Sequence, residues 1–350
     1  MSKIQVENLK YVGEGNANIV FSTDEDQVLR IPKSEQESLE KTKNFIDQVI
    51  KKLVDSSFIG YMNVIEVDPE VSKKLLLQSK RLDKSINYIP KKAYLMENHL
   101  IISRQHKNFS IEIKPKWGYK PNVKGNPIKS KTCRFHMHLH YKKKDDSEFC
   151  PLDLFSDEFE RIFKSVNLLS EVNSNNWKVF VDSIPVEFKS QEIVLTSIVP
   201  MKEENSKVGK KILLLLVCEL LNVSSILKTV KYHQSRLDEL DIEVLYELFK
   251  TCFEEGDENI DTDRIDWNLV VEKYLKRIEK INVAGAGYQE TENINLKNLI
   301  KKHLFNKNNS DGTFYLTDGS IMQYKVRLVD VDLKKPKLKY WFELDKNIYE

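Results

Sequence analysis

Alternation of apolar and polar residues in the first third of the chain predicts β-strands. The segments NIVF (18–21) and QVLRIP (27–32) are two such runs, and the polar turn TDED joins them. Apolar residues in the stretch 35–54 recur at helical spacing, which predicts an amphipathic helix. Further runs at 94–103 and 109–113 predict two more strands.

Helical spacing dominates the second half of the chain. A polar connector at 200–211 and an acidic loop at 254–263 interrupt it. The segment RFHMHLHY (134–141) alternates as a strand does but also fits the start of a helix, and the lysine- and proline-bearing stretch 120–132 predicts a loop. The predicted helices cover 157–172, 209–221, 233–253 and 262–281.

A final strand pattern lies near the C-terminal end of the sequence. After a loop at 306–312, residues 313–333 predict a hairpin that turns at Asp318-Gly319. Strands, then helices, then a returning hairpin indicate an α+β chain in two lobes with a cleft between them. We expect an N-terminal lobe over 1–110 and a C-terminal lobe over 111–350, whose helical part lies at about 200–300.

Composition fits a folded, well-solvated protein. Of 350 residues, 41% are hydrophobic, which is enough for a core and excludes wholesale disorder. Taken as a sum, the net charge of +2 argues against a strongly anionic partner. That sum conceals two opposite segments, because residues 104–144 carry twelve Lys/Arg and one acid, whereas 237–263 carry eleven acids and one Lys. The basic segment predicts an anion site.

Cysteine usage and hydropathy bear on the compartment. The four cysteines, at 133, 150, 218 and 252, form no CxxC pair and match no common zinc spacing, so we expect free thiols in a reducing environment. The N-terminus is polar, and the most apolar run, ILLLLV (212–217), is far shorter than the ~20 residues of a membrane span. We expect a nuclear or cytoplasmic protein that is neither secreted nor bound to a membrane.

A small-residue turn before the first predicted strand is the first candidate site. Glycines let backbone amides approach a polyphosphate, and a glycine turn between two strands is how kinases cover nucleotide phosphates. Neither common phosphate-loop pattern is matched, so an ordinary hairpin turn fits the turn about equally well. The turn consists of Gly13, Glu14, Gly15, Asn16, Ala17 and Asn18.

The basic segment supplies the second candidate site. Lys114 and Lys116 are two apart, so an extended backbone points both ammonium groups the same way. Arg134, His138 and Lys142 follow in the histidine-rich segment and fit an anion site. Alternating histidines on a strand face could instead bind a metal, an interpretation that we favour less because no carboxylate or cysteine cluster has suitable spacing.

Carboxylates near the C-terminus supply the third candidate. Asp318 lies in the predicted turn, and Asp330 and Asp332 follow near a strand end on one face. One carboxylate can hold Mg²⁺ while another accepts a hydroxyl proton, which is the division of labour that phosphoryl transfer requires.

Taken in order, six segments resemble the inositol-pentakisphosphate 2-kinase family, and a fungal-type member of it. They are GEGNAN, EIKPKWGY, CRFHMH, PLDLFS, TDGSIM and DVDLKKP, and they extend from residue 13 to about 345. The resemblance implies transfer of the γ-phosphate of ATP to the axial 2-hydroxyl of inositol 1,3,4,5,6-pentakisphosphate, giving inositol hexakisphosphate (phytate). It also implies a two-lobed fold distantly similar to protein kinases, with a largely helical insertion in the inositide-binding lobe.

The resemblance assigns roles to individual positions. The glycine turn and Arg30 would contact the ATP phosphates, Glu97 and His99 fall at the nucleotide hinge, and Lys178 falls where an ATP-contacting arginine is usual. Asp318 matches the catalytic position. Asp330, with Asp332 beside it, matches the Mg²⁺ ligand. Inositide contacts would come from Lys114, Lys116, Arg134, His138, Lys142, Asn175, Asn176, Lys334, Lys335 and Lys339, with Asn176 also between the two ligands.

The chain departs from the family in two places. Its TDGS replaces the usual KDCS, and the extra lysine in KKP leaves the register after Asp332 uncertain by one, which affects Lys337, Lys339 and Tyr340. Plant and animal members carry a structural zinc site of His and Cys residues. We expect no structural zinc, because that spacing is not reproduced by Cys218, Cys252, His233 and His303.

Two other functions remain open. An inositol polyphosphate multikinase would explain Asp332-Leu333-Lys334 as its DxK, but Leu328 and Pro336 break the rest of that motif. A nucleic-acid-binding module would explain the aromatic residues interleaved with lysines at 114–144 but not the Asp318 and Asp330 segments. We therefore expect two small-molecule substrates, ATP and the inositide, with no direct nucleic-acid partner, and a monomer.

Overall fold

A computed structural model gives the structure of the chain. It describes residues 9–23, 26–34, 38–81, 87–120, 127–144, 147–198, 206–238, 240–250, 265–278, 304–308, 313–316, 321–334 and 337–349. Within these residues the chain is α+β, and its three sheets are antiparallel.

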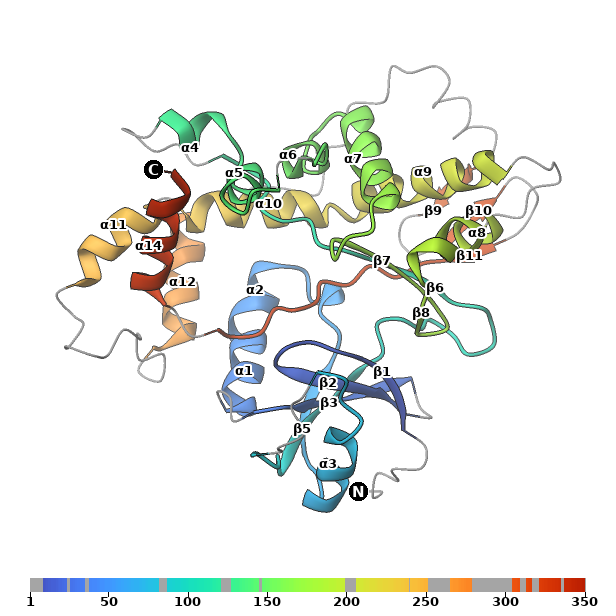
Figure 1. Ribbon diagram of the computed structural model, residues 1–350, viewed down its shortest axis with the longest axis horizontal. Helices are drawn as coiled ribbons and strands as arrows, with labels where there is room; N and C mark the ends of the chain where they lie inside the picture. Colours follow the sequence, from blue (N-terminus) through green and yellow to red (C-terminus); the bar gives the residue numbers. More distant parts are fainter. Residues whose placement is uncertain are drawn as a thin grey trace.

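The first sheet has five strands in the order β1-β2-β3-β5-β4 (Figure 1). One face is fully apolar, since Ile19, Phe21, Leu29 and Ile31 have no exposed surface and pack with α3. This alternation is the pattern that predicted strands at 18–21 and 27–32, and both are confirmed. The strands are β1 (Lys10–Glu14), β2 (Asn18–Ser22), β3 (Gln27–Pro32), β4 (Met62–Glu66) and β5 (Lys92–Glu97).

Two helical segments accompany this sheet. The helix predicted at 35–54 is confirmed as α1 (Leu39–Phe45), the π-helical turn η2 (Ile46–Ile50) and α2 (Lys51–Leu53). Helix α3 (Pro69–Leu76) was not predicted. It begins at Asp68, whose carboxylate accepts a hydrogen bond from the Glu70 amide at 2.8 Å, with a proline at the first position.

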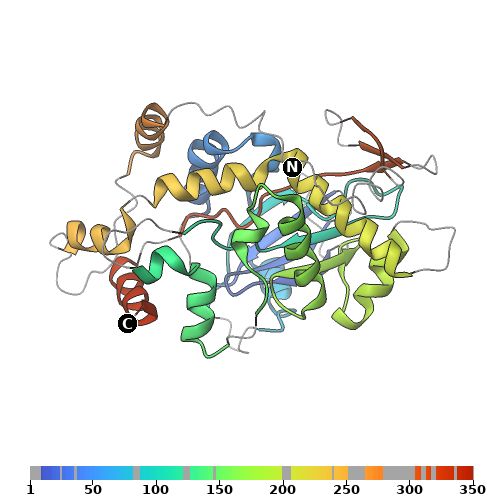
Figure 2. The same ribbon diagram turned by 90° about the horizontal axis from the view of Figure 1, so that it is seen from above.

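The second sheet has the order β6-β7-β8 and lies with the larger group of helices (Figure 1). Its strands are β6 (Phe109–Ile113), as predicted, β7 (Trp177–Val181) and β8 (Ile184–Pro185). The core of this part comes from α7, α8, α9 and β7, with Ile162, Leu195 and Leu214 at or near zero exposure. Figure 2 shows α9 and α10 end to end across the molecule.

The helices of this larger group differ in places from the prediction. The segment 233–253 is broken in two, since Asp241 adopts a left-handed φ of 54° where the second helix begins. A short helix lies within the predicted loop 120–132, and α14 was not predicted. The helices are α4 (Pro127–Lys131), α5 (Arg134–Tyr141), α6 (Pro151–Leu154), α7 (Phe159–Glu171), α8 (Phe188–Ile198), α9 (Ser206–Ser224), α10 (Ile226–Leu237), α11 (Asp241–Phe249), α12 (Trp267–Arg277) and α14 (Leu338–Tyr349), with the 3₁₀ turn η3 (Ser56–Phe58) nearer the first sheet.

The third sheet has the order β11-β10-β9. The strands are β9 (Leu304–Asn308), β10 (Thr313–Leu316) and β11 (Ile321–Gln323), so the predicted hairpin exists but its second strand ends at Gln323 instead of 333. The chain then runs to α14 as an extended segment between the two groups of elements (Figure 1).

That extended segment contacts both cores. Met322, Tyr324 and Val326 pack on the helical core, whereas Leu328 and Val331 pack on the α1 side of the first sheet. Among the described residues no single helix is long and apolar enough to cross a membrane, and α9 and α10 meet the criteria only as a pair bent by 52°.

Candidate functional site

The glycine turn joins β1 to β2 in the first sheet. The Gly15 amide donates to the Asn18 carbonyl at 2.9 Å, which closes the turn. A Cβ placed on Gly13 or Gly15 would meet nothing within 4 Å. The outer side of the turn is therefore open to a ligand, whereas Asn18 is buried at the base of β2.

Glu14 of this turn points inward. Its carboxylate accepts hydrogen bonds from the Lys33 ammonium, from the Ser79 hydroxyl and, at 2.6 Å, from the Lys80 amide. Burial acts to raise the pKa of Glu14, but these donors outweigh it and lower the pKa to about 2. Lys33, which the sequence reasoning missed, also donates to the Gly15 carbonyl at 2.9 Å and so supports the turn from below.

Arg30 lies on β3 behind the glycine turn. Its guanidinium forms a two-point ion pair with Asp332, with Nη1 to Oδ1 at 3.0 Å, and it lies 5.6 Å from the centre of the Tyr94 ring. With its amide oxygen toward Arg30, Asn18 accepts from Nη2 at 2.8 Å. Arg30 was predicted to contact the ATP phosphates and Asp332 to hold Mg²⁺ with Asp330, and the two side chains are thus brought together.

Asp330 lies two residues before this ion pair. Its side chain is three-quarters exposed, its φ is 59°, and the Lys334 ammonium is 3.5 Å from its carboxylate. The carboxylate is open to an added cation, whereas both oxygens of Asp332 already accept from Arg30. Asp318 and Lys335 lie outside the described residues.

Glu97 ends β5 and begins the connection to β6. Lys325 donates to its carboxylate at 2.6 Å and Arg327 at 3.0 Å. Burial acts to raise the pKa of Glu97, but these two cations hold it below the usual value. The pKa of His99 is lowered because the ring is buried. A Cβ on Gly60 would lie 2.4 Å from both side chains, so only glycine fits there.

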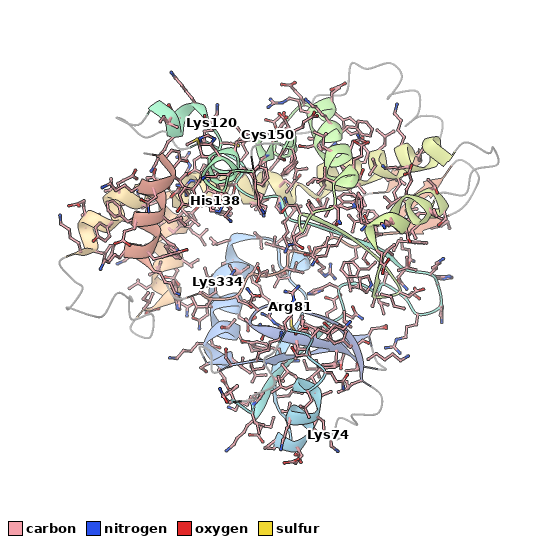
Figure 3. The ribbon with its side chains drawn as sticks, in the orientation of Figure 1. Lys74, Arg81, Lys120, His138, Cys150 and Lys334 are labelled. Atoms are coloured by element: carbon pink, nitrogen blue, oxygen red, sulfur yellow. The ribbon has the colours of Figure 1, made fainter. Side chains whose placement is uncertain are left out.

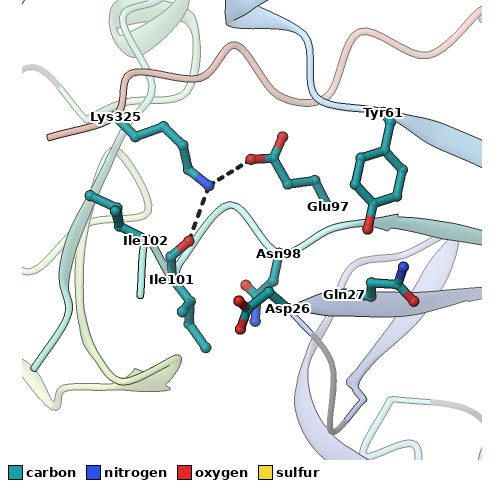
Figure 4. Close-up of a pocket in the computed structure, with 8 residues that line it drawn as sticks. All are labelled: Asp26, Gln27, Tyr61, Glu97, Asn98, Ile101, Ile102 and Lys325. Carbon is teal, nitrogen blue, oxygen red and sulfur yellow. Dashed lines mark hydrogen bonds and ion pairs between the residues drawn. The ribbon is translucent and has the colours of Figure 1, made fainter. Parts of the chain in front are cut away.

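A cavity of about 520 Å³ opens beside this connection (Figure 4). In Figure 4, Lys325 reaches over the Ile101 carbonyl to Glu97, and Tyr61 closes the opposite side. Sequence reasoning missed Lys325, which lies between two predicted site segments. The lining residues are Asp26, Gln27, Tyr61, Glu97, Asn98, Ile101, Ile102 and Lys325.

Three lysines and a histidine of the basic segment gather after β6, namely Lys114, Lys116, Lys142 and His138. The pKa of Lys116 is lowered first by burial and then by repulsion from Lys114 and Lys142. Burial, Lys142 and Lys116 likewise lower the pKa of His138. Lys116 therefore lies within electrostatic reach of Lys114 and Lys142, and His138 lies within reach of Lys142 and Lys116, in an arrangement that an anion would stabilise.

The β6–β7 pairing holds the base of this cluster. The Lys114 amide donates to the Asn176 carbonyl at 2.9 Å, and Asn175 precedes it in the turn into β7. Lys178 lies opposite Glu112 in the register, with its ammonium 3.7 Å from that carboxylate. The predicted asparagine pair is therefore adjacent to Lys114.

The loop that carries Lys116 is fixed from α10. Lys116 has a left-handed φ of 64°, and Gln234 both accepts from the Gly118 amide at 2.9 Å and donates to the Lys116 carbonyl at 3.3 Å. A Cβ on Gly118 would lie 2.5 Å from the Phe155 ring. The close approach of this ring explains the glycine.

Helix α5 carries the remaining predicted cations. It resolves the strand-or-helix alternative at 134–141, so the histidines do not alternate on a strand face as the metal hypothesis assumed. The helical turn places His138 and Lys142 four residues apart on one side. Figure 3 shows His138 in the helical part and Lys334 nearer the sheet.

Arg134 points away from this cluster into a buried group of acids. It donates to Asp238 at 3.2 Å and Asp241 at 3.0 Å and lies 5.6 Å from the Trp117 ring. Lys129, with 1% of its side chain exposed, donates to Asp241 at 3.1 Å and also to Asp345 of α14. Lys339, on the same helix as Asp345, is exposed.

The model of the family described as inositol-pentakisphosphate 2-kinase matches residues 11–347. Curated proteins with that name include one from Danio rerio, 30% identical over 216 residues, which are 51% of this chain and 44% of the relative. One from Cryptococcus neoformans is 28% identical over 276 residues, 69% of this chain and 62% of the relative. The chain thus spans about half the length of the curated relatives it matches. Because the family model covers nearly all of it, this chain belongs to the inositol-pentakisphosphate 2-kinase family.

Proposed function

We propose that this chain is an ATP-dependent kinase that phosphorylates the 2-hydroxyl of inositol 1,3,4,5,6-pentakisphosphate to give inositol hexakisphosphate. The observation that carries the proposal is the group formed by Lys114, Lys116, His138 and Lys142, in which burial and repulsion from neighbouring lysines lower the pKa of Lys116 and of His138. An anion with several phosphates relieves that repulsion. Family membership specifies which anion.

The fold in this proposal has two kinase-like lobes, residues 1–110 on the ATP side and 111–350 on the inositide side, with a helical part at about 200–300. The open side of the glycine turn covers the ATP phosphates, and Arg30, held by Asp332, reaches them from β3. The adenine base of ATP lies at the connection after Glu97, near the cavity of Figure 4. There the backbone contacts the base, because the Glu97 carboxylate is occupied by Lys325 and Arg327.

The inositide occupies the group of Lys114, Lys116, His138 and Lys142. Asn175 and Asn176 join it, as do two exposed lysines, Lys334 before α14 and Lys339 within it. Lys335 would extend this set. Each charge-assisted hydrogen bond to a phosphate contributes roughly 1.5–3 kcal/mol, so several together hold a polyphosphate against water. Arg134 supports the site indirectly, since its guanidinium is bound to Asp238 and Asp241 and backs the Trp117 loop.

Asp318 accepts the proton of the 2-hydroxyl as its oxygen attacks the γ-phosphorus, and the bond from that phosphorus to the bridging β–γ oxygen breaks, so that ADP leaves. Asp330 fits Mg²⁺, because an exposed carboxylate oxygen is the ligand type that this hard cation prefers. Mg²⁺ would supply charge neutralisation between the phosphates, and Asp332 orients Arg30 beside it. The lysines on the inositide side keep the two polyanions from repelling each other.

The deciding experiment is a chromatographic assay of the purified chain with ATP, Mg²⁺ and inositol 1,3,4,5,6-pentakisphosphate. Inositol hexakisphosphate is the expected product. Phosphorylation of less phosphorylated inositols at other positions would favour the multikinase alternative. Nucleic-acid binding without turnover would favour the nucleic-acid-binding module. Asp318→Asn should lose turnover and retain inositide binding. We further propose a monomer in the nucleus or cytoplasm.

A further inference from the structure

Three side chains with soft donor atoms meet beside the first turn of α5. The sulfur atoms of Cys133 and Cys150 and Nδ1 of His136 all lie within 4.8 Å of one another. The Cys133 sulfur is 2.8 Å from Nδ1 of His136. Cys133 is buried and the other two are half-buried. The proposed kinase chemistry uses none of these side chains.

Both cysteines lie at the start of a helix. Cys133 is the N-cap of α5, and its sulfur accepts a hydrogen bond from the His136 amide at 3.5 Å. Cys150 is the N-cap of α6. His136 lies in the first turn of α5, three positions after Cys133.

The second nitrogen of His136 is also positioned. Nε2 lies 3.2 Å from the Ser147 carbonyl oxygen, so a proton on Nε2 can be donated there. The lone pair of Nδ1 then faces the two sulfur atoms. Metal-bound histidines usually make this outer hydrogen bond to a carbonyl or carboxylate, which fixes the ring and its tautomer.

We propose that Cys133, His136 and Cys150 bind a Zn²⁺ ion, with solvent in the fourth position. Two thiolates and a neutral imidazole suit Zn²⁺. Binding releases two thiol protons to water, and the resulting site is neutral, as a half-buried site requires. From Zn–S and Zn–N bond lengths, tetrahedral ligand atoms lie roughly 3.5–3.8 Å apart, so the contact between Cys133 and His136 opens by less than about 1 Å.

This site was missed because the zinc expectation rested on other residues, namely Cys218, Cys252, His233 and His303. Its consequence is mechanical. An ion held by Cys133 and Cys150 closes the loop between them, and that loop includes α5 with His138 and Lys142. The ion would fix the position of α5, which carries His138 and ends at Lys142.

Titration of metal-free, reduced full-length chain with Co²⁺ tests the proposal. Two thiolate ligands should produce an intense sulfur-to-cobalt absorption in the near ultraviolet that saturates at one ion per chain, and Zn²⁺ should displace it. The chain purified without chelators should contain zinc by mass spectrometry. The wild-type titration needs no variant, and absence of the absorption would overturn the proposal.

Two histidine variants on the same helix provide the matched comparison. His136→Gln should weaken Co²⁺ binding at least tenfold, whereas His140→Gln, at an exposed position of α5, should bind as the wild type does. Circular dichroism checks that both variants are folded. Equal Co²⁺ affinity of the two folded variants would overturn the assignment of His136, and unchanged absorption in Cys133→Ser with Cys150→Ser would overturn the site.

Discussion

The Arg30 guanidinium binds both carboxylate oxygens of Asp332, although 302 positions separate the two residues in the sequence. The ion pair ties β3 to the extended segment before α14. Both side chains are less than one-fifth exposed, so the pair is shielded from solvent screening more than a surface pair would be. The pair aligns the guanidinium that we place on the ATP phosphates.

A double-mutant cycle measures this relationship. Arg30→Met, Asp332→Asn and the double variant should show a coupling free energy of unfolding between about 0.5 and 3 kcal/mol by urea denaturation. Each single variant should raise the KM for ATP more than the KM for the inositide. The pair Lys92–Glu40, about half exposed, serves as the control and should couple by less than about 1 kcal/mol. Strict additivity at Arg30 and Asp332 would contradict the prediction.

We expect the Lys116 ammonium to lower the stability of the ligand-free chain and to raise its affinity for the inositide. Folding lowers its pKa, so keeping the ammonium charged disfavours the folded state at pH values below its ordinary 10.5. Lys116→Met retains the apolar stem and removes the charge, so the melting temperature of the ligand-free chain at pH 7 should rise. Affinity for the inositide should fall about 10- to 100-fold, the worth of one charge-assisted contact.

The pH dependence separates charge from packing at Lys116. The stability difference between Lys116→Met and the wild type should shrink as the pH rises toward 10.5, because the wild-type lysine then loses its proton. Lys120→Met, at an exposed position of the same segment, should show little of either effect. A stability difference between Lys116→Met and the wild type that does not change with pH would show that side-chain packing, and not the charge, causes it.

Glu14 should support acid stability. Its pKa of about 2 lies below the ordinary 4.5, so its contribution is complete above pH 4.5 and is lost as the pH falls through about 2. Glu14→Gln leaves the Lys33 ammonium buried without its partner and should cost about 3–5 kcal/mol at pH 7, measured by urea unfolding. Because the wild type loses the same contribution in acid, the two proteins should converge in stability toward pH 2. A constant gap would refute the assignment.

Gly118 should tolerate no side chain. In Gly118→Ala the new Cβ would overlap the Phe155 ring, so the Lys116 loop must shift. We expect a lower melting temperature and a higher KM for the inositide, with the KM for ATP nearly unchanged. Gly15→Ala is the control for stability, because its Cβ meets open space. Equal melting temperatures for the two variants would contradict the steric argument.

The sequence predicted elements best where a single face is buried. In β3 the two residues without exposed surface, Leu29 and Ile31, are two positions apart. In α7 the buried residues Ile162, Val166 and Leu169 recur at helical spacing, and both elements lie where expected. Two of the elements that were not predicted, β1 and α14, lack such a regular spacing of buried residues. Strand β1 has no fully buried position, and α14 buries only Leu338 among its residues. Their positions are set by partners distant in the sequence.

Motifs predicted the candidate site more fully than periodicity did, but not the direction of each side chain. Lys114, Lys116, His138 and Lys142 come together as the basic segment indicated. Arg134 belongs to the same segment and yet turns toward Asp238 and Asp241. Nothing in the motif distinguishes Arg134 from its neighbours, because its partners arrive from helices about a hundred positions later.

The pairing of Lys129 and Arg134 with α11 and its preceding turn gives the acidic segment a physical purpose. Acids from 237–263 act as built-in counter-ions that cancel selected basic side chains and leave others uncompensated. Substrate capture then depends on which cations the helices leave unneutralised, more than on how many lysines the segment holds. Salt should therefore compete with the ligand at Lys116 and Lys142 while leaving the internal pairs largely intact.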